Sequence, residues 1–125
     1  MRAAGTFEVK LTLLESVDPT IGRMLIEKTF SGDLQAVSRG EMLGVMDQQL
    51  GSGAYVAQEL VKGALNGRTG GFALVHRGVM TRGAPNLVVE VVPDSGAGGL
   101  AGLTGAMQIV VEGGKHSYVF DYELP

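Results

Sequence analysis

Apolar and polar residues alternate with a period of two along most of this chain. The pattern is clearest between Phe7 and Leu13, where the odd-numbered residues are apolar and the even-numbered residues are polar or charged. Successive side chains of a β-strand point to opposite faces of a sheet, so this spacing is typical of a strand with one buried face. No segment of eleven or more residues has the spacing of an amphipathic helix. The alternation therefore predicts an all-β protein.

Turn-forming residues separate the alternating segments. The clearest turn is Asn66-Gly67, because both central residues of a type I′ hairpin turn need a positive φ, which asparagine and glycine tolerate. The stretch Gly44–Gly53 is the least regular, and a short helical turn and a loop fit it equally well. The other predicted turns are Val17–Thr20, Ser31–Asp33, Gly83–Asn86, Pro93–Gly96 and Gly113–Gly114. We expect eight strands, over residues 7–13, 23–30, 34–43, 55–65, 72–81, 87–92, 105–112 and 116–124.

Consecutive hairpins predict a meander, in which each strand pairs with the next one along the chain. Short strands at this spacing fit either a sandwich or an up-and-down barrel, and a barrel is favoured because closure removes the sheet edges. We therefore predict a closed antiparallel eight-stranded meander barrel that occupies residues 1–125 as a single domain. A chain of this length buries enough surface to form a core without disulfides.

Composition argues against several classes of protein. The net charge is −3 and the basic residues are scattered, so we expect no nucleic-acid partner. There is no cysteine, and His76 and His116 cannot form a metal site alone, so we expect no metal and no cofactor. The spacing of Gly96, Gly98 and Ala101 fits a dinucleotide-binding loop, but the residues after them predict a strand instead of the required helix. Without a signal-peptide core or a membrane-length apolar run, we expect a cytoplasmic protein that contacts no membrane.

Polar residues on apolar strand faces are the most specific functional signal. Lys28, Glu59 and His76 each share a face with apolar neighbours, and a buried lysine needs an acidic partner, for which Glu59 is the natural candidate. Our first hypothesis is a lumen pocket for a small apolar or amphipathic molecule, with Lys28, Tyr118 and Phe120 as ligand-binding residues. Glu59 or His76 would then move a proton in isomerase- or cyclase-like chemistry. The alternative is a structural ion pair among tyrosines that fill the core.

Two further hypotheses rest on other features. The strands over residues 72–81 and 87–92 are apolar on both faces, which predicts a covered outer wall and favours a homo-oligomer. The corresponding hypothesis for function is a non-catalytic structural or interaction protein. A loop or terminus of the same chain could cover that wall instead. Asp94 follows the end of a strand, and we interpret it either as a turn-capping residue or as a catalytic acid. With Glu59 or Asp121 as its partner, it would define an acid-dependent, aspartic-type hydrolase or self-processing peptidase.

Four stretches, taken together, resemble a known family. They are GRMLIEKTFSGDL, AYVAQELVKGALNGRTGGFALVHRGVMTRGAP, VVPDSGAGGLAGLTGAMQI and GKHSYVFDYEL. Their order and spacing make the region from Thr6 to Leu124 similar to the bacterial domain-of-unknown-function family 3224. That family is assigned to the allene oxide cyclase-like barrels, which include plant dirigent proteins. The resemblance therefore implies a closed eight-stranded antiparallel barrel, often oligomeric, with a lumen pocket, but it implies no activity and no site residues.

Overall fold

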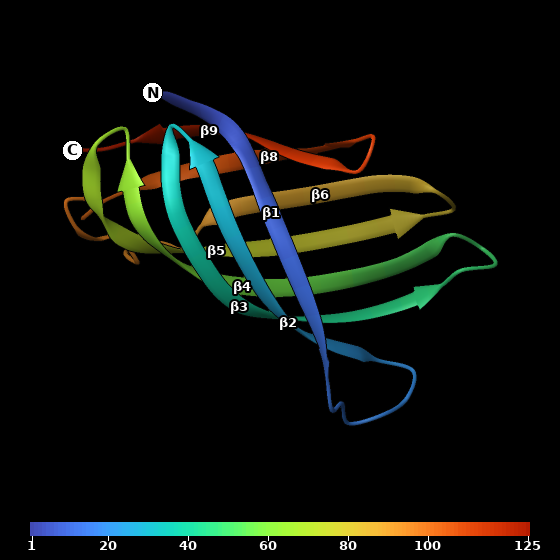
Figure 1. The fold of residues 1–125 in the computed structure, drawn as a ribbon. Helices are drawn as coiled ribbons and strands as arrows, with labels where there is room; N and C mark the ends of the chain where they lie inside the picture. The colour runs from blue at the N-terminus through green and yellow to red at the C-terminus, as the bar shows by residue number, and fades with distance from the viewer.

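Each strand predicted from the alternation is present in the computed structural model, which describes residues 1–125 (Figure 1). A two-residue strand, β7 (Ala97–Gly98), adds to the long ones by pairing with the start of β5. No helix forms, and so none is available to cross a membrane. The eight long strands are β1 (Arg2–Leu14), β2 (Gly22–Gly32), β3 (Leu34–Asp47), β4 (Ser52–Leu65), β5 (Arg68–Thr81), β6 (Ala84–Val91), β8 (Thr104–Glu112) and β9 (Lys115–Glu123).

Antiparallel pairing closes these strands into a barrel. Each long strand pairs with the next long strand along the chain, and β9 returns to pair with β1. The closed antiparallel eight-stranded meander barrel is thus confirmed. Because the pairing runs without interruption from β1 to β5, the alternation in the sequence sorts each strand into one inner and one outer face.

The hairpin turns follow the chemistry of their residues in most places. The φ angles of Asn66 and Gly67 are 46° and 83°, which is the type I′ pattern expected there. Two expectations need correction. The turn before β6 is formed by Arg82 and Gly83, with φ angles of 49° and 82°, so that residues 84–86 belong to the strand. Most of the irregular stretch around residues 44–53 is also strand, since β3 runs to Asp47 and β4 begins five residues later.

Buried apolar side chains pack together at one end of the barrel. Phe72 and Phe120 stack there with ring centroids 5.8 Å apart, inside a cluster of 17 buried apolar residues. The loop between β6 and β8 plugs this end with Leu100 and Leu103, both of which are buried in the same cluster. Gly96 permits the tight fold of this loop, because a Cβ atom there would lie 2.0 Å from the carbonyl oxygen of Leu100. The glycines thus serve backbone packing, and no helix follows them.

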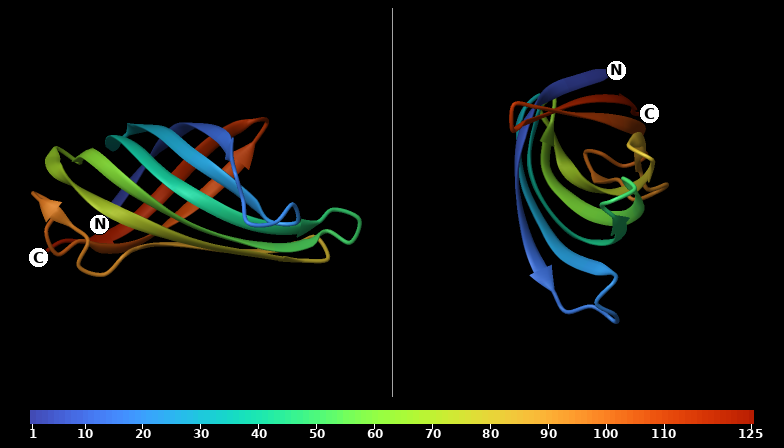
Figure 2. Two further views of the ribbon diagram at one scale, coloured as in Figure 1. Left: turned by 90° about the horizontal axis from the view of Figure 1, so that it is seen from below. Right: turned by 90° about the vertical axis from the view of Figure 1, so that its right-hand side faces the viewer.

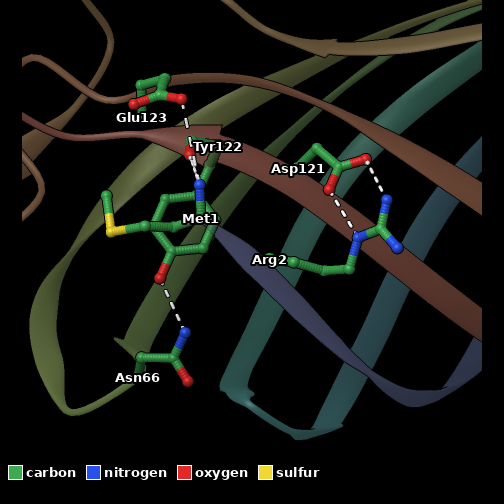
Figure 3. A network of polar contacts seen from close by, with 6 residues as sticks. All are labelled: Met1, Arg2, Asn66, Asp121, Tyr122 and Glu123. Atoms are coloured by element: carbon green, nitrogen blue, oxygen red, sulfur yellow. Dashed lines mark hydrogen bonds and ion pairs between the residues drawn. The ribbon is translucent and has the colours of Figure 1, made fainter.

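A polar network fastens β9 to β1 and to the β4–β5 turn at the filled end (Figure 3). The amino group of Met1 donates to the carbonyl oxygen of Tyr122 at 2.8 Å, and the side-chain amide of Asn66 donates to the Tyr122 hydroxyl at 2.7 Å. Outside the barrel, the Arg2 guanidinium holds Asp121 through bonds of 2.7 and 3.2 Å. This double contact keeps the pKa of Asp121 below its ordinary value.

At its other end the barrel is open. The strand β9 pairs with β1 only as far as Phe7, and the only residue pair that joins β6 to β8 is Glu90 with Ala106. Strands β1 to β6 therefore continue past the β8–β9 hairpin as a curved sheet whose inner face is concave (Figure 2). The molecule is a closed, packed barrel at one end and a trough at the other.

The outer wall is covered in one place and exposed in others. Ala73, on the outer face of β5, is buried because the loop after β6 crosses it, with the Ser95 hydroxyl 3.0 Å from the Ala73 amide nitrogen. Here the chain covers its own wall. Val56, Leu60 and Val88 stay exposed on the outer face of the neighbouring strands. The two-faced apolar pattern therefore corresponds partly to internal packing and partly to free surface.

Candidate functional site

Four polar side chains lie on the inner face of four adjacent strands. Lys28 is on β2, Ser38 on β3, Glu59 on β4 and His76 on β5, and each occupies the inward position of its strand's alternation. Lys28 is directly opposite Ser38 in the β2–β3 pairing. Glu59 is opposite Gly40, where a Cβ atom would lie 2.6 Å from the Glu59 Cα atom. We call these four residues the polar cluster.

An ion pair organises the polar cluster. Lys28 Nζ lies 2.9 Å from Glu59 Oε2, and His76 Nε2 lies 3.4 Å from the same oxygen. The exposed fractions of the three side chains are only 6% for Lys28, 0% for Glu59 and 4% for His76. Lys28 Nζ also lies 4.8 Å from the centre of the Phe7 ring, a cation–π distance. The predicted pairing of Lys28 with Glu59 is confirmed, and His76 joins it.

The charge of Glu59 is set by opposing effects. Burial on its own would raise the pKa of Glu59, but the contact with His76 and the positive charge of Lys28 outweigh it and hold that pKa below its ordinary value. Tyr55 is affected in turn. Burial, followed by the negative charge of Glu59, raises the pKa of the Tyr55 hydroxyl. The site thus contains a buried carboxylate that is stabilised as the anion.

Several polar atoms of the cluster lack a hydrogen bond within the protein. Ser38 Oγ and Glu59 Oε1 have no partner, while Glu59 Oε2 and His76 Nε2 meet at ion-pair distance without hydrogen-bond geometry. Buried polar groups are nearly always paired, and an unpaired one costs about 1–3 kcal/mol. The charges of Lys28 and Glu59 therefore offset each other, but the hydrogen bonding of the cluster is incomplete.

A pocket of about 400 Å³ opens on the inner face of the trough, next to the polar cluster. The Tyr55 ring lies between the pocket and His76, with the two ring centres 6.3 Å apart. Gly78 makes room for that ring, since a Cβ atom at Gly78 would lie 2.3 Å from Tyr55 Cε1. The larger inward-facing side chains of the lining are Met42, Met46, Tyr55, Met80 and Leu87. Methionine adapts its shape readily, which suits a surface that accommodates apolar molecules.

None of the three predicted ligand-binding residues lines this pocket, since Lys28 lies in the polar cluster behind Tyr55. Tyr118 and Phe120 lie in the packed end of the barrel and are buried in the core cluster. The Tyr118 hydroxyl donates to the Ser31 carbonyl oxygen at 2.8 Å and accepts from the Leu34 amide at 3.0 Å. Both residues therefore pack in the core, and neither lines the pocket.

The three acids of the hydrolase hypothesis lie in different environments. Asp94 is exposed in the turn after β6, with a φ of 62°, Asp121 is exposed on the outer face in its contact with Arg2, and Glu59 is inside the barrel. Nothing in the structure pairs these carboxylates with one another. Nor do three or more histidine, aspartate or glutamate side chains gather where they could bind a metal ion.

Ser38, Tyr55 and the pocket methionines were not singled out by the sequence reasoning. The signal for Ser38 was the same as for Lys28, a polar residue at an inward position between apolar or small neighbours. The position of Tyr55 two residues before an inward alanine placed it on the face of Glu59. The methionines carried no such signal, because inward methionine is ordinary in a core.

A solved structure has the same fold as this chain. A crystal structure of a protein of unknown function from the DUF3224 family of Shewanella oneidensis MR-1 is similar to this chain, with 46% sequence identity and a TM-score of 0.94. The likeness covers 100% of this chain and 97% of that one. No curated protein matches the chain. The model of the family described as "Protein of unknown function (DUF3224)" matches residues 3–122. The chain therefore belongs to the DUF3224 family.

Proposed function

We propose that this protein binds a small apolar or amphipathic molecule in the trough, with the apolar part against the methionines and Tyr55. The observation that carries the proposal is the pocket of about 400 Å³, which ends next to a buried polar cluster. Ligand pockets usually have about this volume, apolar walls and a few polar groups that fix orientation. A resemblance to the allene oxide cyclase-like barrels, in which the lumen holds a pocket, supports the same proposal.

The proposal is binding and not catalysis. Glu59 and His76 could exchange a proton with a ligand only if the ligand reached them, and both side chains lie behind Tyr55 with almost no exposed surface. The Glu59 carboxylate is also held by Lys28, which lowers its basicity. These features argue against a turnover cycle, and a polar group of the ligand would contact the cluster only with the Tyr55 ring displaced.

A fluorescence titration with N-phenyl-1-naphthylamine, an apolar probe that brightens in apolar surroundings, tests the proposal. Leu87 faces the pocket from β6, and its neighbour Val88 faces the outer wall with similar exposure, 42% against 36%. Leu87→Trp fills the pocket mouth and should weaken binding by at least about tenfold. The matched control Val88→Trp should leave binding unchanged.

Two results would refute the proposal. The first is a wild-type protein that does not brighten the probe, and the second is equal weakening by the two tryptophan variants, which would place the probe elsewhere. Mass spectrometry of an organic extract of protein purified from cells would then identify the class of natural ligand, because a pocket-bound molecule should be depleted in Leu87→Trp and retained in Val88→Trp.

The exposed outer wall favours a second candidate function, assembly into an oligomer. Its support is the set of exposed apolar side chains on β4 and β6, among them Val56, Leu60 and Val88. A mass in solution above 13.0 kDa that falls to that value when Leu60 is replaced by lysine would support it.

A further inference from the structure

The second half of β1 is an unpaired sheet edge. Beyond Phe7, where β9 ends its pairing, residues Glu8–Leu14 pair only with β2 (Figure 1). This segment contains no proline, glycine or bulge, and its register with β2 is continuous. Proteins usually protect such an edge, because its free N–H and C=O groups can pair with another strand. The edge of β6 is protected by Pro85, whereas the edge of β1 contains no proline and carries charges only at Glu8 and Lys10.

The direction of the free backbone groups follows from the alternation. Ala4 exchanges hydrogen bonds with Asp33 on the β2 side, since its amide donates to Asp33 Oδ2 at 2.9 Å and its carbonyl accepts from the Asp33 amide at 3.1 Å. In a strand without a bulge, even-numbered residues therefore turn these groups towards β2 and odd-numbered residues turn them away. The free groups of the edge belong to Val9, Leu11 and Leu13, whose side chains all face the apolar inside of the trough.

We propose that two copies of this chain pair through this edge, β1 against β1, antiparallel about a two-fold axis at Leu11. That register places Leu11 opposite Leu11 of the second copy and Val9 opposite Leu13, so that every free backbone group of the three residues finds a partner. The inner faces of the two troughs then lie on the same side of one continuous sheet. Leu11 and Leu13, which are 50% and 73% exposed in the single chain, become covered by their counterparts.

Neighbouring registers are less favourable. An axis at Lys10 would put two lysines directly opposite each other, which is destabilising. An axis at Thr12 would place Val9 opposite Glu15, a residue beyond the end of β1, and would lose a residue pair at each end. With the axis at Leu11, Lys10 faces Thr12 and Glu8 faces Leu14, so that no like charges meet. The edge is therefore complementary to itself in one register.

Disulfide trapping tests the pairing, because the chain contains no cysteine. In the proposed dimer the two Leu11 Cα atoms are about 5.5 Å apart, within the range that a disulfide spans. The two Leu13 Cα atoms are about 13 Å apart along the strands, beyond that range. Leu11→Cys should therefore form a covalent dimer under mild oxidation, and Leu13→Cys should not. Because Leu13 is the more exposed residue, random collisions would favour the opposite result.

Mass in solution provides the second measurement. Light scattering should give twice 13.0 kDa for the wild type and the monomer mass for Leu11→Lys, which places two charges opposite each other at the axis. We expect Leu11→Lys to fold, because Leu11 is half exposed in the single chain, and circular dichroism checks this. A monomeric wild type, equal cross-linking of the two cysteine variants, or a dimer that persists in Leu11→Lys would each overturn the proposal. None of these outcomes depends on ligand binding, so the proposed function is tested separately.

Discussion

The buried ion pair between Lys28 and Glu59 leads to a quantitative prediction about stability. At an effective dielectric constant of about 20, two unit charges 2.9 Å apart attract each other by about 6 kcal/mol. Desolvation of two buried ions costs several kcal/mol for each, so the pair as a whole contributes little. Removing one partner leaves the desolvation cost of the other buried charge without any compensating attraction. Lys28→Met and Glu59→Leu should therefore each lower the free energy of unfolding by about 3–5 kcal/mol.

The double variant should be more stable than either single variant, because neither Lys28 nor Glu59 is then left as an unpaired buried charge. Urea unfolding followed by circular dichroism measures all four corners of this double-mutant cycle. As a control, Glu27→Leu changes the residue directly before Lys28 on β2. Glu27 and Arg39 form an exposed ion pair 4.0 Å apart, so this variant should leave the free energy of unfolding almost unchanged. Strict additivity of the two single changes would refute the reasoning, since it would mean that Lys28 and Glu59 do not interact.

Two further predictions follow from hydrogen bonding and from protonation. Tyr118→Phe removes the hydroxyl that bonds to Ser31 and Leu34, and should lower the free energy of unfolding in urea by about 1–3 kcal/mol. Probe binding in the trough should not change. A loss of probe binding with intact stability would contradict the packing role. The pKa of Glu59 is lower in the folded protein than the ordinary value of about 4.3, so its contribution to stability is present above that pH and is lost as the pH falls through the folded value. As the pH falls below about 4.3, the wild type should therefore lose stability more steeply than Glu59→Gln, and a wild type that loses it less steeply would show that burial dominates.

The fold could be predicted largely from the sequence, because side-chain alternation determines the strands and their inward faces. The corrections have physical reasons. Arg82 adopts a positive φ although arginine has no preference for it, so the nearby Pro85 looked like the better turn residue. Gly44 suggested a break, whereas in the structure it lies opposite Tyr55, whose Cβ atom would be 3.4 Å from a Cβ atom at Gly44. Alternation also says nothing of where one strand stops pairing with another, so the open end was not predictable.

For the candidate site, the sequence predicted which residues face the lumen but not how far along the barrel axis each of them lies. Electrostatics predicted the Lys28–Glu59 pair, because a charge on an apolar face needs a partner. The depth of a residue along the barrel depends on the register between strands, which the sequence does not reveal. Lys28 is opposite Val9, towards the open end, whereas Tyr118 is opposite Gly5, in the packed end. Tyr118 therefore faces the same lumen at another level.

The position of the polar cluster along the barrel axis indicates its role. On one side, Phe7 of the packed core covers Lys28, and on the other, Tyr55 leads to the pocket. A purely structural ion pair would be most stable with all its atoms satisfied, yet Ser38 Oγ and Glu59 Oε1 have no partner. Core positions that break the rule of hydrogen-bond satisfaction are expected where function compensates for lost stability. Unsatisfied acceptors at the boundary between packed core and apolar trough suit a ligand with a hydrogen-bond donor at one end, provided that the Tyr55 ring moves aside, because that ring separates them from the pocket.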